Sequence, residues 1–139
     1  MKALDIRIFD TLPDDSRRIR TEVFVDEQGF REEFDTDDNI ATHIVGYING
    51  NPVATCRILP KKGCFTIGRV AVAKSFRNNG LGSRIIIAAE EHISKCGGGI
   101  IYIHSQLQAA PFYEKLGYKP TGETDFEEGC PHCMLTKHI

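Results

Sequence analysis

The sequence predicts an α/β fold, in which a mixed, largely antiparallel sheet of about seven strands carries helices on both faces. Three observations support this prediction. Strand-like runs joined by short turns occupy residues 42–72. A strand, a glycine-rich loop, a helix and another strand follow over residues 64–104, and two more strand patterns come last. The length of 139 residues fits one domain, residues 1–139, with a core large enough to fold unaided.

The first strand and the first helix are expected within residues 4–24. Leu4 to Phe9 alternates apolar and charged side chains, as a strand with one buried face does. Pro13 to about Phe24 is expected to be a helix. Pro13 is tolerated in a first turn, and Asp14 and Asp15 favour the positive end of the helix dipole.

Three antiparallel strands are expected next. Strand patterns cover Thr42 to Ile48 and Pro52 to Leu59. Asn49-Gly50 between them is a strong hairpin signal, because both turn positions need positive φ. Lys61-Lys62-Gly63 then turns into a third strand, Cys64 to Val72.

Helices and strands alternate in the second half. The helical spacing of apolar residues after Gly80 stops at Gly97-Gly98-Gly99, and Pro111 fits only the first turn of a short helix. Two strands joined by a helix should be parallel neighbours with a right-handed crossover, so the strand ending at Val72 should lie beside the strand that starts at Ile100. The expected elements are helices at 80–96 and 109–116 and strands at 100–104, 119–126 and 132–138.

A loop with one arginine and two glycines separates the strand ending at Val72 from the following helix. Arg77 offers paired donors suited to phosphate, while Gly80 and Gly82 leave room for a ligand beside the positive end of the helix dipole. The known dinucleotide and nucleoside-triphosphate loops do not fit, because a third glycine and a lysine after Gly82 are absent. The loop is therefore a candidate anion site, with a turn that only caps the helix as the alternative.

Charge and cysteine content narrow the class of protein. Seventeen basic and 19 acidic residues give a net charge of −2, which offers no electrostatic footprint for nucleic acid or an anionic membrane. No apolar run approaches the ~20 residues of a membrane span, and the charged start of the chain does not fit a signal peptide. Five cysteines without a disulfide-like spacing are expected to be mostly reduced thiols, which predicts a cytoplasmic protein.

Two motifs resemble those of the GCN5-related N-acetyltransferase (GNAT) superfamily. Arg77-x-x-Gly80-x-Gly82, after Val70-Ala71-Val72, is similar to the family's acetyl-CoA motif. The second family motif is usually Asn-x-x-Ala-x-x-Phe-Tyr-x-x-x-Gly-Phe. Its matching positions here are Gln106, Ala109, Phe112, Tyr113, Gly117 and Tyr118.

A narrower resemblance is to the ElaA-like branch of that superfamily, in which the substrate is generally unassigned. The residues that carry it are Arg20 to Gln28, Asp35, Asp38, His43 and Glu128 to Met134.

The resemblance implies a GNAT fold with a splayed parallel strand pair, and acetyl-CoA as co-substrate without a metal. Backbone amides of the loop would hold the diphosphate of coenzyme A. The pantetheine arm would run like an extra strand beside Val70 to Val72. In the second motif, Gln106 occupies a position at which asparagine is commoner in the family. The implied cofactor-binding residues are Val70, Ala71, Val72, Arg77, Asn78, Asn79, Gly80, Leu81, Gly82, Ser83 and Gln106.

The reaction implied is direct attack of a primary amine on the acetyl thioester. Tyr113 occupies the family's position for protonating the leaving thiolate, and its alternative role is that of a core aromatic residue. The base that takes the amine proton is either Glu27 or His132. Their alternative roles are an exposed or arginine-paired carboxylate for Glu27 and a hydrogen-bonded residue at a strand end for His132.

Three other polar residues are expected to be structural. His43 and His104 are assigned no catalytic role, and Arg69 should pair with a carboxylate.

The acceptor is expected to be a small-molecule or peptide amine. Peptide N-termini, polyamines, aminosugars and lysine side chains all remain open, and a homodimer is common in the family. A run of carboxylates has a solvated loop as its plainer interpretation and contact with a cationic acceptor as the other. The run consists of Glu32, Glu33, Asp35, Asp37 and Asp38.

Three rival functions are weighed. Cys130-Pro131-His132-Cys133 has the spacing of thiol–disulfide oxidoreductases, but such a motif opens a helix and this segment has a strand pattern. A zinc site on the same pair lacks a second cysteine pair at metal spacing. A non-catalytic coenzyme A binding or sensing module is the remaining alternative, against which Tyr113 argues.

Overall fold

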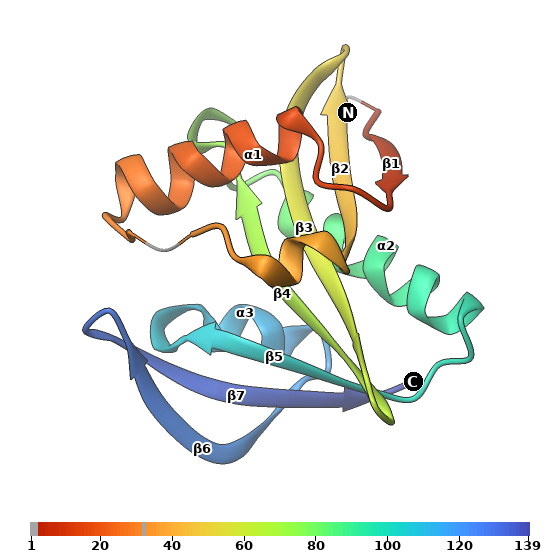
Figure 1. Cartoon of the computed structure of the whole chain (residues 1–139), viewed down its shortest axis with the longest axis vertical. Coiled ribbons are helices and arrows are strands. Elements are labelled where there is room, and N and C mark those ends of the chain that lie inside the picture. Colours follow the sequence, from red (N-terminus) through yellow and green to blue (C-terminus); the bar gives the residue numbers. More distant parts are fainter. Residues whose placement is uncertain (1–2, 32) are drawn as a thin grey trace.

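The computed structural model describes residues 3–31 and 33–139 (Figure 1). Seven strands form one sheet in the order β1-β2-β3-β4-β5-β7-β6, and all neighbours are antiparallel except the parallel pair β4 and β5. The predicted strands and the parallel crossover are confirmed. The strands are β1 (Asp5–Phe9), β2 (Thr42–Ile48), β3 (Asn51–Lys61), β4 (Cys64–Val72), β5 (Ile100–Gln106), β6 (Lys119–Glu127) and β7 (Cys130–His138).

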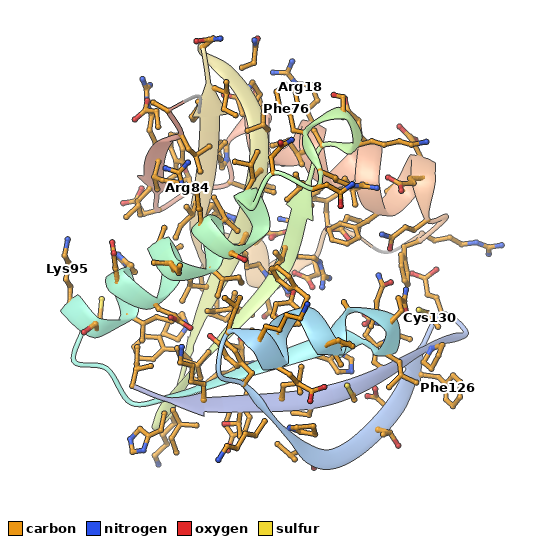
Figure 2. The ribbon with its side chains drawn as sticks, turned by 180° about the vertical axis from the view of Figure 1, so that it is seen from behind. Arg18, Phe76, Arg84, Lys95, Phe126 and Cys130 are labelled. Atoms are coloured by element: carbon orange, nitrogen blue, oxygen red, sulfur yellow. The ribbon has the colours of Figure 1, made fainter. Side chains whose placement is uncertain are left out.

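Helices cover both faces of this sheet. The α1 helix (Asp14–Arg20) packs on β2, β3 and β4, and α2 (Leu81–Lys95) packs on the same strands from the other side. The α3 helix (Ala110–Lys115) contacts β7 on the α2 side, which is the side seen in Figure 2. No helix among residues 3–31 and 33–139 is both long and apolar enough to cross a membrane. Shorter helical turns are η2 (Thr36–Asn39), η3 (Lys74–Phe76) and η4 (Leu107–Ala109).

The first helix differs from its prediction in length and type. After Arg20 the chain continues as a π-helical segment, η1 (Thr21–Glu27), so helical structure extends three residues beyond Phe24. A π-helix is a local insertion into an α-helix, and apolar spacing alone does not reveal it. Gln28 and Phe30 follow this π-helical segment and line a pocket together with residues of β4 and β5.

The core lies between α2 and the sheet. Ile85, Ile86 and Ile93 of α2 are fully buried against strand residues that include Ile44 and Ile101. Each such isoleucine contributes roughly 2 kcal/mol through removal of its side chain from water. This packing fixes the position of the α2 N-terminus relative to the end of β4.

The parallel pair β4–β5 is joined over a short length only. Residue pairing runs from Cys64↔Ile100 to Thr66↔Tyr102, after which the two strands diverge, as Figure 1 shows. A β-bulge lies in the divergent part of β4, where Arg69 and Val70 face the single residue Cys56 of β3. Arg69 has a φ of 52°, which widens the bulge. The divergence leaves one edge of β4 without a partner strand in the described part of the chain.

Candidate active site

A pocket of about 480 Å³ lies where β4 and β5 diverge. Of the residues predicted for catalysis or cofactor binding, it brings together Val70 of the bulge, Gln106 at the end of β5, Tyr113 of α3 and His132 of β7. Glu27 and the predicted phosphate loop, residues 77–83, do not line it. The pocket therefore joins the predicted acid to one of the two predicted bases.

Glu27 is engaged by an arginine. Its carboxylate accepts two hydrogen bonds of 2.7 Å from the guanidinium of Arg77. These bonds lower the pKa of Glu27, partly offset by desolvation. A carboxylate held in this way is a weak base, so the arginine-paired role is the one that the structure shows.

The phosphate loop offers backbone groups rather than a free guanidinium. Arg77 also donates from Nε to the carbonyl of Val72 at 3.0 Å, so its side chain is used within the protein. Gly80 adopts a φ of 74° and begins α2 without a side-chain cap. The first amide that bonds back into the helix is that of Arg84, which donates to Gly80 at 3.2 Å. The amides of the first turn are thus available to an anion.

The two glycines of the loop serve different purposes. Gly80 has open space around its missing Cβ and is needed for its positive φ. A Cβ on Gly82 would lie 3.1 Å from Cζ of Phe112, so this glycine permits close packing of α2 on α3. Room for a ligand, which the sequence suggested for both glycines, is therefore not the only reason for a glycine at position 82. Asn78 also has a left-handed backbone, with a φ of 65°. The side-chain amide of Asn79 donates hydrogen bonds to the backbone carbonyls of Phe76 and Arg77.

Tyr113 is buried in the pocket wall. Its ring makes edge contacts with Phe112 and Tyr118 at centroid distances of 5.0 and 6.2 Å. Burial raises the pKa of Tyr113 far above its usual value, so the hydroxyl stays protonated. Among the residues that the structure describes, none is hydrogen-bonded to this hydroxyl. The proton is consequently free to be donated to a group in the pocket.

His132 lines the same pocket from β7, and one of its ring nitrogens is hydrogen-bonded while the other is free of a direct hydrogen bond. Nδ1 is 2.8 Å from the carbonyl oxygen of Cys130, so Nδ1 carries a proton and donates it. Nε2 faces Oε2 of Glu127 at 3.7 Å, which is too long for a hydrogen bond. In the neutral ring, the Nε2 lone pair is therefore available to the pocket.

His104 is a site residue that sequence reasoning missed. It was expected to be structural, but it lines the pocket and its ring stacks on His132 at a centroid distance of 4.6 Å. Its Nε2 lies 2.7 Å from Oδ1 of Asp125. Only the strand register could have revealed this contact, because Gln106 pairs with His132 and places His104 diagonally beside it. We refer to His104, Asp125, Glu127 and His132 as the histidine cluster.

Two contacts join the walls across the gap. Gln106 donates from Nε2 to Oε1 of Gln28 at 2.6 Å, and the backbone amide of Arg31 donates to the carboxylate of Glu128 at 2.9 and 3.1 Å. The Gln106 side chain, expected to contact cofactor, is thus part of a bridge over the pocket. Gln28 and Glu128 belong to segments matched by the ElaA-like resemblance, but no role was predicted for either.

The acidic run is largely neutralised by arginines. Arg20 bonds Glu33 and Asp38 at 2.8 Å each, and Arg57 bonds Asp35 and Asp38 at 2.8 and 3.0 Å. Arg69 pairs with Glu33 and Asp35, as predicted for this residue. Asp37 lines the pocket, and Glu32 lies outside the described residues. We refer to Arg20, Arg57, Arg69, Glu33, Asp35 and Asp38 as the arginine–carboxylate cluster.

The cysteine motif does not form a redox site. Cys130 and Cys133 lie within β7, where residues three apart point to opposite faces of the sheet. Both are free thiols, as are Cys56, Cys64 and Cys96. Figure 2 shows Cys130 near the tip of the β6–β7 hairpin, where it is the first residue of a strand and not of a helix.

A sheet that opens between two parallel strands, beside the uncapped start of a helix, suits a co-substrate that has an anionic group and an extended arm. Residues 12–139 match the family model "Acetyltransferase (GNAT) domain", and the chain belongs to this acetyltransferase family. It is 37% identical over 126 residues to the uncharacterized N-acetyltransferase YjcF of Bacillus subtilis (strain 168), covering 88% of this chain and 90% of the relative.

Solved structures agree with this assignment and with the predicted branch. Escherichia coli ElaA superposes with a TM-score of 0.87 at 26% identity, covering 98% of this chain and all of that one. A GNAT family acetyltransferase from Elizabethkingia anophelis, solved with acetyl-CoA bound, has a TM-score of 0.77 at 16% identity and shares the fold over 98% of both chains. The chain therefore has the GNAT fold, and relatives in the family bind acetyl-CoA.

Proposed function

We propose that this acetyltransferase moves the acetyl group of acetyl-CoA to a primary amine by direct attack, with Tyr113 as general acid and His132 as general base. The observation that carries the proposal is their position in one pocket, at the bulge beside the unpaired edge of β4. The region 1–139 would act as a single catalytic domain. The amine is that of a small molecule or a peptide.

The phosphate loop and the strand gap fit the co-substrate. The free amides at the start of α2 suit the diphosphate, and the edge of β4 from Val70 to Val72 can pair with an extended pantetheine arm. When bound, acetyl-CoA supplies the activated acyl group. A backbone amide at the bulge, near Val70 or Ala71, would stabilise charge on the thioester oxygen by ~3 kcal/mol.

The proton balance assigns one role to each of the two residues. His132 Nε2 takes a proton from the amine, directly or through water, which frees the nitrogen lone pair for attack. The new C–N bond forms as the C–S bond breaks. The hydroxyl of Tyr113 gives its proton to the departing thiolate of coenzyme A, and the resulting tyrosinate is reprotonated by the second proton, which the nitrogen loses on becoming an amide. Glu27 is less suited to the basic role because its carboxylate is held by Arg77.

The acid is tested by thiol release from acetyl-CoA with a panel of peptide, polyamine, aminosugar and lysine amines. Tyr113→Phe should lower kcat by about 10²-fold or more while acetyl-CoA affinity is unchanged. Tyr118→Phe is a matched control, because that hydroxyl bonds Glu90 outside the pocket and its loss should leave kcat unaltered. Full activity of Tyr113→Phe would remove the acid assignment. A thermal shift with acetyl-CoA but no turnover on any amine would point to a coenzyme A sensor instead.

The base is tested by the pH dependence of kcat/KM. His132→Gln should abolish the acidic limb of the profile and lower the rate about 10²-fold or more, whereas Glu27→Gln should keep that limb. A profile that loses its acidic limb in Glu27→Gln and keeps it in His132→Gln would reverse the assignment.

A further inference from the structure

Three potential metal ligands converge on one point of the pocket wall. One ligand atom from each of His104, Glu127 and His132 lies within 4.8 Å of the other two. Nδ1 of His104 and Nε2 of His132 are each 3.7 Å from Oε2 of Glu127, so neither forms a direct hydrogen bond with it. They come from three strands, β5, β6 and β7, whose pairing fixes their backbones relative to one another.

Hydrogen bonds on the far side of each ring fix which nitrogen carries the proton. The Asp125 carboxylate can only accept, so Nε2 of His104 must donate to it, and in the neutral ring Nδ1 is left bare. The Cys130 carbonyl can only accept as well, so Nδ1 of His132 donates and Nε2 is left bare. With both rings neutral, two lone pairs and a carboxylate therefore face one another, an arrangement that repels until a proton or a metal cation enters.

We propose that His104, Glu127 and His132 form a binding site for a divalent transition-metal ion of the zinc class. In a tetrahedral zinc site with bonds of ~2.1 Å, neighbouring ligand atoms are about 3.4 Å apart. Two of the three separations here, at 3.7 Å, are already close to that value. The third is at most 4.8 Å and closes by rotation of His104 and Glu127, whose side chains are partly exposed.

The outer contacts are those expected around a metal. In protein zinc sites a ligating histidine donates its other N–H to a carboxylate or a backbone carbonyl, and both forms occur here. Three protein ligands leave a fourth position that faces the pocket, open to water or an amine. The family resemblance implied no metal, and these ligands, which are separated by 23 and 5 positions, match no short ligand motif.

The metal and the catalytic proton compete for the same lone pair. A metal bound to Nε2 of His132 prevents that atom from accepting a proton, so occupancy should inhibit acetyl transfer if His132 is the base. Metal binding itself does not depend on that role. Absence of metal binding would therefore leave the proposed acetyl transfer intact, and absence of acetyl transfer would leave the proposed metal site intact.

The test is calorimetric titration of the reduced, chelator-treated full chain with Zn²⁺ in the absence of acetyl-CoA. One equivalent should bind, and His104→Ala or His132→Ala should each weaken binding at least 10-fold. Asp125→Ala, which removes only an outer contact, should weaken it 10- to 100-fold. Co²⁺ should give visible d–d bands without thiolate charge-transfer absorption.

Control variants separate this site from the other histidines and cysteines. His92 of α2 and Cys96 at its C-cap also offer potential metal ligands, with Nε2 and Sγ 3.7 Å apart. The double variant His92→Ala/Cys96→Ser should retain full binding. The proposal is overturned if no Zn²⁺ binds, if binding survives both His104→Ala and His132→Ala, or if it depends on His92, Cys96 or the thiols of β7.

Discussion

The two walls of the pocket use charged side chains in opposite ways. On the β4 side, the arginine–carboxylate cluster contains three arginines and three carboxylates, and each is paired with at least one member of opposite charge. On the β5–β7 side, the histidine cluster places Nδ1 of His104 and Nε2 of His132 each 3.7 Å from Oε2 of Glu127, which is too long for a hydrogen bond. Arg20 is fully buried, whereas Asp125 and Glu127 are exposed.

This difference separates a scaffold from a reactive surface. Paired charges that are largely buried hold a backbone in place, and here they anchor the bulge through Arg69 and the 33–38 segment through Arg20 and Arg57. Incompletely paired groups keep the capacity to bind a proton, a metal or a substrate. The predictions below ask how sharply the two walls differ.

The largest effect is expected from Arg20→Met. The substitution keeps an apolar stem but leaves Glu33 and Asp38 buried without their main partner. Breaking a buried ion pair from one side costs about 3–5 kcal/mol, so the free energy of unfolding in urea should fall by that amount. Arg18→Met is the control on the same helix, because Arg18 is exposed and its ion pair within residues 3–31 and 33–139 is with the partly exposed Asp15. A loss below 1 kcal/mol for Arg20→Met would show that the cluster is not structural.

Acid sensitivity should arise on the same wall. Burial tends to raise the pKa of Asp38, but hydrogen bonds and charges from Arg20 and Arg57 outweigh it and lower the pKa to about 2. A lowered pKa in the folded state stabilises the protein above pH 4, and this contribution is lost as the pH falls toward 2. The loss amounts to about 2 kcal/mol at most.

The Asp38→Asn variant isolates this effect. Its free energy of unfolding should depend less steeply on pH between 4 and 2 than that of the unaltered chain. Glu33 acts in the opposite sense, because burial outweighs its arginine bonds and raises its pKa. An unchanged slope in Asp38→Asn would assign the acid sensitivity to other carboxylates.

The sequence revealed the β4 side of the site better than the β5–β7 side. Local patterns were sufficient for the strands, for α2 and for the turn at Asn49-Gly50, where both residues have positive φ. Pairing of Arg69 with carboxylates also followed from its place in β4. These features depend on neighbours in sequence or on charge balance alone.

The histidine cluster depends on strand register, which the sequence did not supply. His104 and His132 are adjacent only because β5 pairs with β7, while β6 lies outside them at the sheet edge. The bidentate Glu27–Arg77 pair likewise joins segments 50 residues apart. The turn of π-helix that carries Glu27 there has no signature in apolar spacing.

A smaller effect is expected where the walls meet. Glu128→Gln weakens the charged hydrogen bonds to the Arg31 amide, which hold the loop after η1 against the β6–β7 turn. The stability loss should be about 1 kcal/mol, and amide hydrogen exchange should accelerate at residues 28–31 while exchange in α2 is unchanged. Glu123→Gln on the same hairpin is a control that should alter neither. Unchanged exchange at 28–31 would mean that Gln28–Gln106 alone closes the pocket.

The smallest effect on stability is expected from Asp125→Ala, on the β5–β7 wall. Its carboxylate is 61% exposed, so loss of the contact with His104 should change the free energy of unfolding by less than 0.5 kcal/mol. The His104 ring should nevertheless respond, because its Nε2–H loses the acceptor that fixes the tautomer. Nitrogen NMR of the imidazole rings should show a single Nε2–H form of neutral His104 become a mixture, while His132 keeps its Nδ1–H form through the Cys130 carbonyl. A stability loss above 1 kcal/mol would make this wall as structural as the other, and the contrast between a paired scaffold and a reactive surface would no longer hold.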